Sequence, residues 1–146
     1  MSNITAWVHY VWTTKKRKPL MTKNIRQDIF DHIRENAKSK NIHIDFINGY
    51  TEHVHVLVSV KANYNLGEIA QLIKGESSFW INKNKLTPQK FEWQRRYWAV
   101  SIGLSEVNRI RNYIKGQEEH HSKKSFNEEL DEFIEKYGLE RFPEDD

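Results

Sequence analysis

The order in which strand-like and helix-like segments follow one another constrains the fold of this chain more than any other feature. Strands alternate apolar and polar positions or are rich in β-branched and aromatic residues, whereas helices repeat apolar residues every three to four positions. Strand-like segments lie at residues 3–13, 42–46, 52–60 and 93–102, and helix-like segments at residues 22–40 and 65–83. This order predicts an α+β, ferredoxin-like split βαβ sandwich, with an antiparallel sheet and helices on one face.

Signals at the ends of the segments support this division. Thr22 stands where a capping residue would begin the first helix, and the Asn-Gly pair at residues 48–49 predicts a tight hairpin. Beyond the last strand, Ser105 is expected to cap a third helix that runs to His121. Residues 126–137 have the pattern of a further amphipathic helix, so the sandwich is expected to carry C-terminal helices.

Composition limits the kinds of site that the chain can build. Its 146 residues are 38% hydrophobic and 29% charged, which is typical of a soluble globular domain. No apolar run approaches the roughly 20 residues that span a bilayer, and we expect no signal peptide. The chain has no cysteine, so any metal would be bound by His, Asp, Glu, Asn or Gln.

Charge is divided unevenly along the chain. The net charge is +3, yet residues 118–146 hold eleven acidic and four basic side chains, a charge of −7. The remaining 19 basic and 9 acidic side chains give residues 1–117 a charge of +10. A basic body favours a polyanionic partner, although an ordinary basic protein with a solvated acidic helix would have the same composition.

His53 and His55 form the first candidate site. Residues two apart in a strand point to the same side, so the two imidazoles would lie next to one another, while Val54 and Val56 would pack on a core. Two adjacent imidazoles are a common way to bind a divalent metal. The alternative is a pair of polar residues on a solvent-facing side of the strand.

Tyr113 and Gln117 form the second candidate site, because residues four apart in a helix share a face. A Gln oxygen suits a hard cation such as Mg²⁺, and a phenol becomes a reasonable nucleophile beside a metal that holds a phosphate. The alternative is a half-buried aromatic residue and a solubilising surface residue. His121 could join the metal ligands, or could lie exposed with His120 at a helix end.

A third candidate region consists of the basic loop Lys15–Lys18 and the segment Trp93–Trp98, which together mix basic and aromatic residues. Such a combination binds single strands through phosphate contacts and base stacking. Most of the aromatic rings are nevertheless expected to lie in the core. Gly75 is unusual inside a helix, where glycine costs about 1 kcal/mol; either a close approach of DNA or tight helix packing would explain it. The candidate DNA-binding residues are Lys15, Lys16, Arg17, Lys18, Lys74, Arg95 and Arg96.

Taken together, these segments resemble the HUH-type single-tyrosine transposases of the insertion-sequence 200/605 family. The matching segments occur in order over about residues 3–121, with about 60 residues between the histidine pair and Tyr113. They are Val11–Lys15, Glu52–Leu57, Ile73–Ser78, Trp93–Ser101 and Val107–His121.

The resemblance implies a role for each catalytic position. His53, His55 and Gln117 would bind the divalent metal, Mg²⁺ or Mn²⁺. Tyr113 would attack a DNA phosphodiester, giving a 5′-phosphotyrosine link and a free 3′-hydroxyl, and the attack of another 3′-hydroxyl would rejoin the strands. The partners would be single-stranded DNA hairpins at transposon ends and a second copy of the chain, whose site the tyrosine helix could complete.

The resemblance also gives expectations for the whole chain. We expect a single-tyrosine transposase catalytic domain at residues 1–121 and an acidic helical extension of the same domain at residues 122–146. A cytoplasmic, nucleoid-associated protein of a bacterium or archaeon is expected. Two other functions stay open: a hairpin-binding regulator derived from such a transposase that does not cut, and a nuclease that uses water and leaves no protein–DNA adduct.

Overall fold

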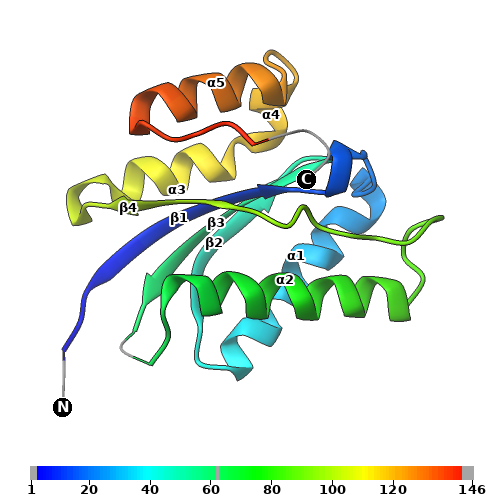
Figure 1. Ribbon diagram of the computed structural model, residues 1–146, viewed down its shortest axis with the longest axis horizontal. Helices are drawn as coiled ribbons and strands as arrows, with labels where there is room; N and C mark the ends of the chain where they lie inside the picture. The colour runs from blue at the N-terminus through cyan, green and yellow to red at the C-terminus, as the bar shows by residue number, and fades with distance from the viewer. Residues whose placement is uncertain (1–2, 62, 143–146) are drawn as a thin grey trace.

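The computed structural model describes residues 3–61 and 63–142 and shows an antiparallel sheet between two layers of helices (Figure 1). Its four strands are ordered β2-β3-β1-β4. The strands are β1 (Ala6–Thr13), β2 (His43–Gly49), β3 (His53–Val60) and β4 (Trp98–Ile102). The helices are α1 (Lys23–Ser39), α2 (Leu66–Lys83), α3 (Val107–Lys115), α4 (Gln117–His121) and α5 (Phe126–Tyr137), with short 3-10 turns η1 (Lys15–Arg17) and η2 (Leu104–Glu106). The predicted α+β fold is confirmed.

One face of the sheet packs against α1 and α2 and forms the main hydrophobic core (Figure 1). Alternate residues of each strand point to this face, as the period of two requires. The strand residues buried in it include Val8, Tyr10, Trp12, Val54, Val56 and Val58. Because their exposed fraction is 5% or less, these side chains supply much of the hydrophobic stabilisation of the fold.

The opposite face carries the C-terminal helices. Leu57 of β3 packs there with Ile110 and Ile114 of α3, and a second cluster joins Val11 and Trp98 to the buried residues of α5. The three histidines His9, His53 and His55 alternate with the core residues of β1 and β3 and therefore point to this face as well. Among the described residues, no helix is both long enough and apolar enough to cross a membrane.

The predicted hairpin exists, but its turn is misplaced. Asn48 and Gly49 are the last residues of β2, and the chain turns at residues 50–52, where the Tyr50 N–H donates to the His53 carbonyl at 3.0 Å. A Cβ on Gly49 would lie 2.2 Å from the His53 carbonyl oxygen. Glycine is required here because the two backbones approach closely, not because of a two-residue turn.

A bulge overturns the predicted alternation of β2. Ile44 is buried in the main core as expected, but the register shifts between Ile44 and Phe46, and Phe46 packs against the α3 side of the sheet. The residue at the shift, Asp45, accepts two hydrogen bonds from Arg111 of α3 at 2.7 and 2.9 Å. The bulge thereby ties α3 to the edge of the sheet.

The last strand is shorter than predicted. Residues 93–97 do not continue β4. The Gln94 N–H donates to the Thr13 carbonyl at 2.9 Å, but the Thr13 N–H donates to the Gln94 side-chain Oε1 at 2.8 Å instead of to a backbone carbonyl. Trp93 makes only an isolated bridge to Thr14. An irregular segment therefore leads into the five-residue strand.

The predicted helix from Val107 to His121 is interrupted at Gly116, which divides it into α3 and α4. Ser105 does not cap it, since this residue lies inside η2. Thr22 occupies the N-cap position of α1, but its side chain makes no capping hydrogen bond. Ser125 is a true cap: its hydroxyl accepts from the Glu128 N–H at 3.2 Å and fixes the start of α5.

Candidate active site

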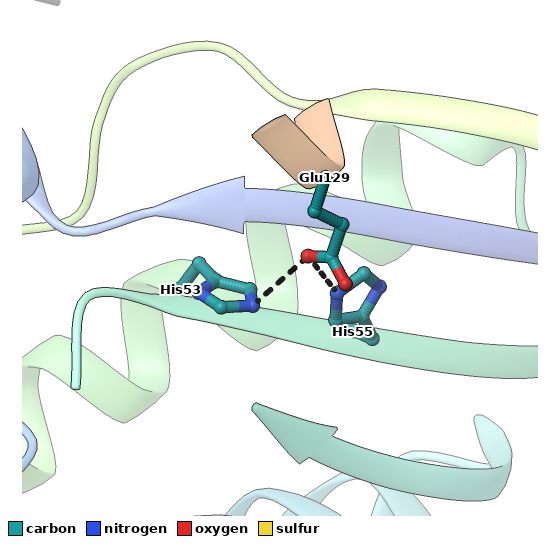
Figure 2. Close-up of side chains that lie close together, drawn as sticks. All are labelled: His53, His55 and Glu129. Atoms are coloured by element: carbon teal, nitrogen blue, oxygen red, sulfur yellow. Dashed lines mark hydrogen bonds and ion pairs between the residues drawn. The ribbon is translucent and has the colours of Figure 1, made fainter. Parts of the chain in front are cut away.

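The two histidines of β3 face a carboxylate that descends from α5 (Figure 2). Glu129 Oε1 lies 3.4 Å from His53 Nε2 and 3.3 Å from His55 Nε2. All three side chains are buried, with exposed fractions of 4% or less. The face of β3 that carries the pair is therefore covered by protein, so the alternative of two solvent-facing histidines is wrong.

Helix α4 adds two side chains that could bind a metal, Gln117 and His121, to the same cluster. Gln117 Oε1 lies 2.9 Å from His53 Nε2 and 3.1 Å from His121 Nε2, and His121 Nε2 lies 3.2 Å from Glu129 Oε1. Exposure of His121 at a helix end is wrong, because only 2% of its side chain is accessible. His120 remains 27% exposed, with its Nε2 3.2 Å from Glu129 Oε2.

Tyr113 of α3 joins this cluster through its hydroxyl. The hydroxyl donates to Glu129 Oε2, to which Gln117 Nε2 also donates at 3.0 Å. The centroid of the phenol ring is 5.5 Å from that of His55. The break at Gly116 does not separate the tyrosine from the glutamine, and one chain brings the phenol beside the imidazole pair. Burial raises the pKa of Tyr113, so the phenol carries its proton at neutral pH.

Burial and neighbouring charges shift the pKa values of the carboxylate and the imidazoles in the cluster in different directions. Burial alone would raise the pKa of Glu129, but the charge of His55 and hydrogen bonds from the other imidazoles outweigh it and hold the pKa far below its usual range. For His53, hydrogen bonds to Glu129 and Glu52 overcome burial and raise the pKa to about 9. Burial lowers the pKa of His55 and of His9. The pKa values of the two histidines of β3 are thus shifted in opposite directions, His53 upward and His55 downward.

Two further side chains orient the histidine pair from behind. Glu52 Oε1 lies 2.6 Å from His53 Nδ1, and His9 Nε2 lies 2.9 Å from His55 Nδ1. Contacts at Nδ1 fix the ring so that Nε2 faces the cluster, which is the usual outer support of a metal-binding histidine. Neither Glu52 nor His9 was predicted as part of the site; Glu52 precedes His53 in the sequence, and His9 lies on the neighbouring strand β1, opposite Leu57.

The donor atoms fit a divalent cation. The printed sequence offers no thiolate, and the cluster supplies nitrogen and oxygen donors from His53, His55, His121, Gln117 and Glu129. The contacts that join these atoms measure 2.9 to 3.4 Å. Neighbouring ligands of a cation whose bonds measure about 2.1 Å are separated by about 3.0 to 3.4 Å. Nitrogen with oxygen donors suits first-row divalent metals as well as Mg²⁺.

Comparison with known proteins identifies the family. Residues 2–117 match the family described as transposase, IS200-like. The chain belongs to the IS200-like transposase family. No curated protein matches its sequence. The resemblance inferred from the motifs is therefore confirmed, and the match ends at Gln117, before the acidic C-terminal segment.

Two solved structures share the fold of this IS200-like transposase, each with a TM-score of 0.62. One is a protein of Deinococcus radiodurans R1 described as a candidate transposase, with 18% identity over 80% of this chain and 93% of its own. The other is a REP-associated tyrosine transposase bound to a REP hairpin, with 14% identity over 83% of this chain and 72% of its own. At these identities the likeness establishes the fold.

The structure brings all four predicted catalytic and metal-binding residues of this transposase into one cluster, namely His53, His55, Tyr113 and Gln117. Sequence reasoning missed Glu129 as well as Glu52 and His9. Glu129 falls on the buried stripe of α5 beside Leu130, between Phe126 and Phe133. An acidic residue on the apolar stripe of an amphipathic helix was the available signal, because a carboxylate is almost never buried without a partner.

Lys74 and Gly75 lie away from this cluster, on an open groove of about 810 Å³ beside α2. Lys74 Nζ donates to the carbonyl oxygens of Arg95 and Arg96 at 3.0 and 3.1 Å, and burial lowers its pKa to about 8. A Cβ on Gly75 would meet no atom within 4 Å. Tight helix packing therefore does not explain this glycine. The open space beside it agrees with the alternative, a close approach of DNA to the helix backbone.

The basic loop, Lys15–Lys18, leads from the sheet toward α5. Lys15 pairs with Glu92 at 3.4 Å, whereas the Arg17 guanidinium donates to Asn127 and lies 5.4 Å from the Phe126 ring centroid. Of the neighbouring rings, Trp93 and Trp98 are 7% and 3% exposed. The expectation that most of these rings lie in the core is confirmed, which leaves the cations and the half-buried Tyr97, which lines the groove, as the accessible part of this region.

Proposed function

We propose that this transposase cuts and rejoins single-stranded DNA, with Tyr113 as the nucleophile and with His53, His55 and Gln117 as ligands of a divalent metal, Mg²⁺ or Mn²⁺. One observation supports it above all. The Tyr113 hydroxyl and the two Nε2 atoms of the histidine pair meet at the two oxygens of a single buried carboxylate. Phosphoryl transfer needs a nucleophile held beside the groups that stabilise the phosphate.

In the proposed reaction, the Tyr113 oxygen attacks the phosphorus and forms an O–P bond while the bond from phosphorus to the 3′ oxygen breaks. The products are a 5′-phosphotyrosine and a 3′-hydroxyl, which takes up one proton. The phenol is protonated before attack, so its proton passes to solvent as the O–P bond forms and balances the one that the 3′ oxygen takes up. Glu129 Oε2 accepts a hydrogen bond from this hydroxyl and orients it. A divalent cation, when bound, polarises the phosphate. Attack by a 3′-hydroxyl reverses these steps and rejoins the strands.

We also propose that hairpin DNA binds across the basic loop and the groove beside α2. The charge of +10 on residues 1–117 and the opening of about 810 Å³ support this, and a neighbour of the same fold is bound to a REP hairpin. Non-specific affinity for single strands comes from such cations. The proposed contacts are Lys15, Lys16, Arg17, Lys18, Lys74, Arg95 and Arg96.

The proposal extends to the organisation of the chain. Residues 1–121 would form the catalytic domain and residues 122–146 its extension. The separation of 5.5 Å between the Tyr113 and His55 rings supports catalysis within a single chain. A homodimer, and a cytoplasmic, nucleoid-associated location, stay predictions from the family resemblance.

Tyr113→Phe tests the nucleophile. Wild-type protein incubated with labelled single-stranded element ends and Mn²⁺ should give a band shifted under denaturing conditions. The variant should lose this adduct by at least about 10³-fold, because a nucleophile has no substitute, while hairpin binding in a native gel persists. Tyr50→Phe is the matched control, since its ring stacks on His121 at 5.2 Å but its hydroxyl has no role in the proposal.

The same assay separates the rival functions. An adduct formed by Tyr113→Phe would remove the proposed nucleophile. Cut strands without any adduct from wild-type protein would indicate a hydrolytic nuclease. Hairpin binding with neither cutting nor adduct would indicate a regulator that has kept only recognition.

A further inference from the structure

Glu129 is a buried member of the cluster that lies outside the family match, which ends at Gln117. We propose that Glu129 is a metal ligand, delivered by α5, which completes the site formed by His53, His55 and Gln117. This proposal rests on the proposed function, because it assigns a further ligand to the same metal. It gives the acidic C-terminal segment a chemical role beyond a solvated surface helix.

The position of the Glu129 oxygen is the first argument. Glu129 Oε1 lies 3.4, 3.3 and 3.2 Å from the Nε2 atoms of His53, His55 and His121. One carboxylate oxygen thus lies at similar distances from three imidazole nitrogens, and two of these rings are held at Nδ1 by His9 and Glu52. The same separations are those of adjacent ligands around a cation, about 3.0 to 3.4 Å for bonds of about 2.1 Å.

The charge of the buried carboxylate is the second argument. Within residues 3–61 and 63–142, the ion pairs of Glu129 are all with histidines and none is with Lys or Arg. A carboxylate that is 4% exposed needs a compensating charge. A protonated imidazole provides one positive charge, whereas a divalent cation bound at the same point would provide two.

The two oxygens of Glu129 are used differently, which is the third argument. Oε2 accepts from the Tyr113 hydroxyl and from Gln117 Nε2 at 3.0 Å. These contacts fix the rotation of the carboxylate and aim Oε1 at the imidazole nitrogens. Outer contacts of this kind hold a ligand in the geometry that a metal requires.

The helix that carries Glu129 is firmly attached to the sheet. Phe126, Leu130 and Phe133 of α5 are buried against Val11 and Trp98, and Trp98 Nε1 also donates to the Glu140 carbonyl at 2.8 Å. A ligand on a packed helix is positioned more accurately than one on a loop. The site therefore draws its donors from β3, α4 and α5, and its assembly requires the C-terminal segment to be folded.

Manganese is the appropriate ion for the test, because a donor set rich in imidazole favours first-row transition metals over Mg²⁺. The full-length, metal-free protein would be titrated with Mn²⁺ by calorimetry, independently of any DNA reaction. Glu129→Gln should weaken binding at least ~10-fold, since it keeps the side-chain size but removes the charge. Glu132→Gln is the matched control: it lies on the same helix, 65% exposed, and should bind as wild type does.

Circular dichroism of the metal-free variants would show whether α5 stays folded. If Glu129→Gln fails to fold, Glu129→Asp keeps the charge and withdraws the oxygen by one methylene, and it should also weaken Mn²⁺ binding. An unchanged affinity in the folded variants would overturn the proposal. So would tighter binding, which would mean that the carboxylate competes with the cation for the imidazoles.

His53→Ala keeps this inference separate from the proposed function. Loss of Mn²⁺ binding in His53→Ala, with Glu129→Gln unaffected, would leave the histidine site standing and remove Glu129 from it. Wild-type protein that binds no Mn²⁺ would count against both proposals.

Discussion

The two faces of the sheet are built from the same strands, but one forms the main hydrophobic core and the other carries the candidate site. On one face of β3, Val54 and Val56 pack into an apolar core against α1 and α2. On the other, His53 and His55 meet donors from α4 and α5. Because side chains alternate along a strand, adjacent residues belong to different layers, and a single strand carries both the main core and the candidate site.

The difference teaches what each face demands from the rest of the chain. Apolar side chains need volume, and many packings of similar size satisfy them. The buried polar side chains of the site need particular partners, since an unpaired one costs free energy. The site face is accordingly completed by three helices from the last third of the chain, whereas the core face is completed by α1, α2 and the segment that carries Phe91 and Trp93.

Adjacent substitutions on β3 should separate the two faces most sharply. His55→Ala is expected to reduce metal-dependent cleavage at least about 10³-fold, since it removes a proposed ligand. Val56→Ala should instead lower the free energy of unfolding by about 2 kcal/mol through the cavity that it leaves, with little change in Mn²⁺ affinity. A single-strand cleavage assay, calorimetric Mn²⁺ titration and urea denaturation of both variants measure these effects.

The comparison breaks if the two variants behave alike. Full cleavage by His55→Ala would remove the metal assignment from the site face. A loss of Mn²⁺ binding in a folded Val56→Ala variant would show that the core face controls the site geometry, so the faces would not be separable.

Much of the sheet could be predicted because alternation is a local property. The segment 52–60 contains both the apolar face and the histidine pair, and alternation within the segment predicts both without any distant residue. The turn before it could not be predicted in the same way. Gly49 is needed where the backbone of His53 crosses it, and that contact exists only once the strands have paired. The shift at Asp45 likewise depends on Arg111, 66 residues away.

The candidate site, like the sheet, contains some residues that local spacing predicts and others that depend on distant contacts. Tyr113 and Gln117 were predicted as neighbours from their spacing of four. Both contact Glu129, even though α3 ends at Gly116, between them. The position of Glu129 could not be derived from spacing, because α5 reaches the histidines only by packing across the sheet. His121 was misjudged for the same reason, since α5 covers a helix end that the sequence alone leaves exposed.

Gly75→Ala tests whether the groove beside α2, on the main-core side of the sheet, binds DNA. Alanine in this helix interior should raise the free energy of unfolding by about 0.5 to 1 kcal/mol, because its Cβ meets no atom within 4 Å. If DNA approaches the α2 backbone in the groove, the same methyl should weaken hairpin binding several-fold. Urea denaturation and a gel-shift titration measure the two quantities; a stabilised variant with unchanged hairpin affinity would place the DNA elsewhere.

Lys74 should give the smallest effect and the one most specific to the groove. Burial lowers its pKa to about 8, below its unfolded value of about 10.4, so the native protein releases this proton first as pH rises. Stability attributable to Lys74 should therefore increase between about pH 8 and pH 10 and be absent below pH 8. Since the side chain is only partly buried, the gain should stay below about 1 kcal/mol. Urea denaturation of the wild type and of Lys74→Met across this range measures it; parallel curves would mean that the Lys74 ammonium is better solvated than its contacts with Arg95 and Arg96 indicate.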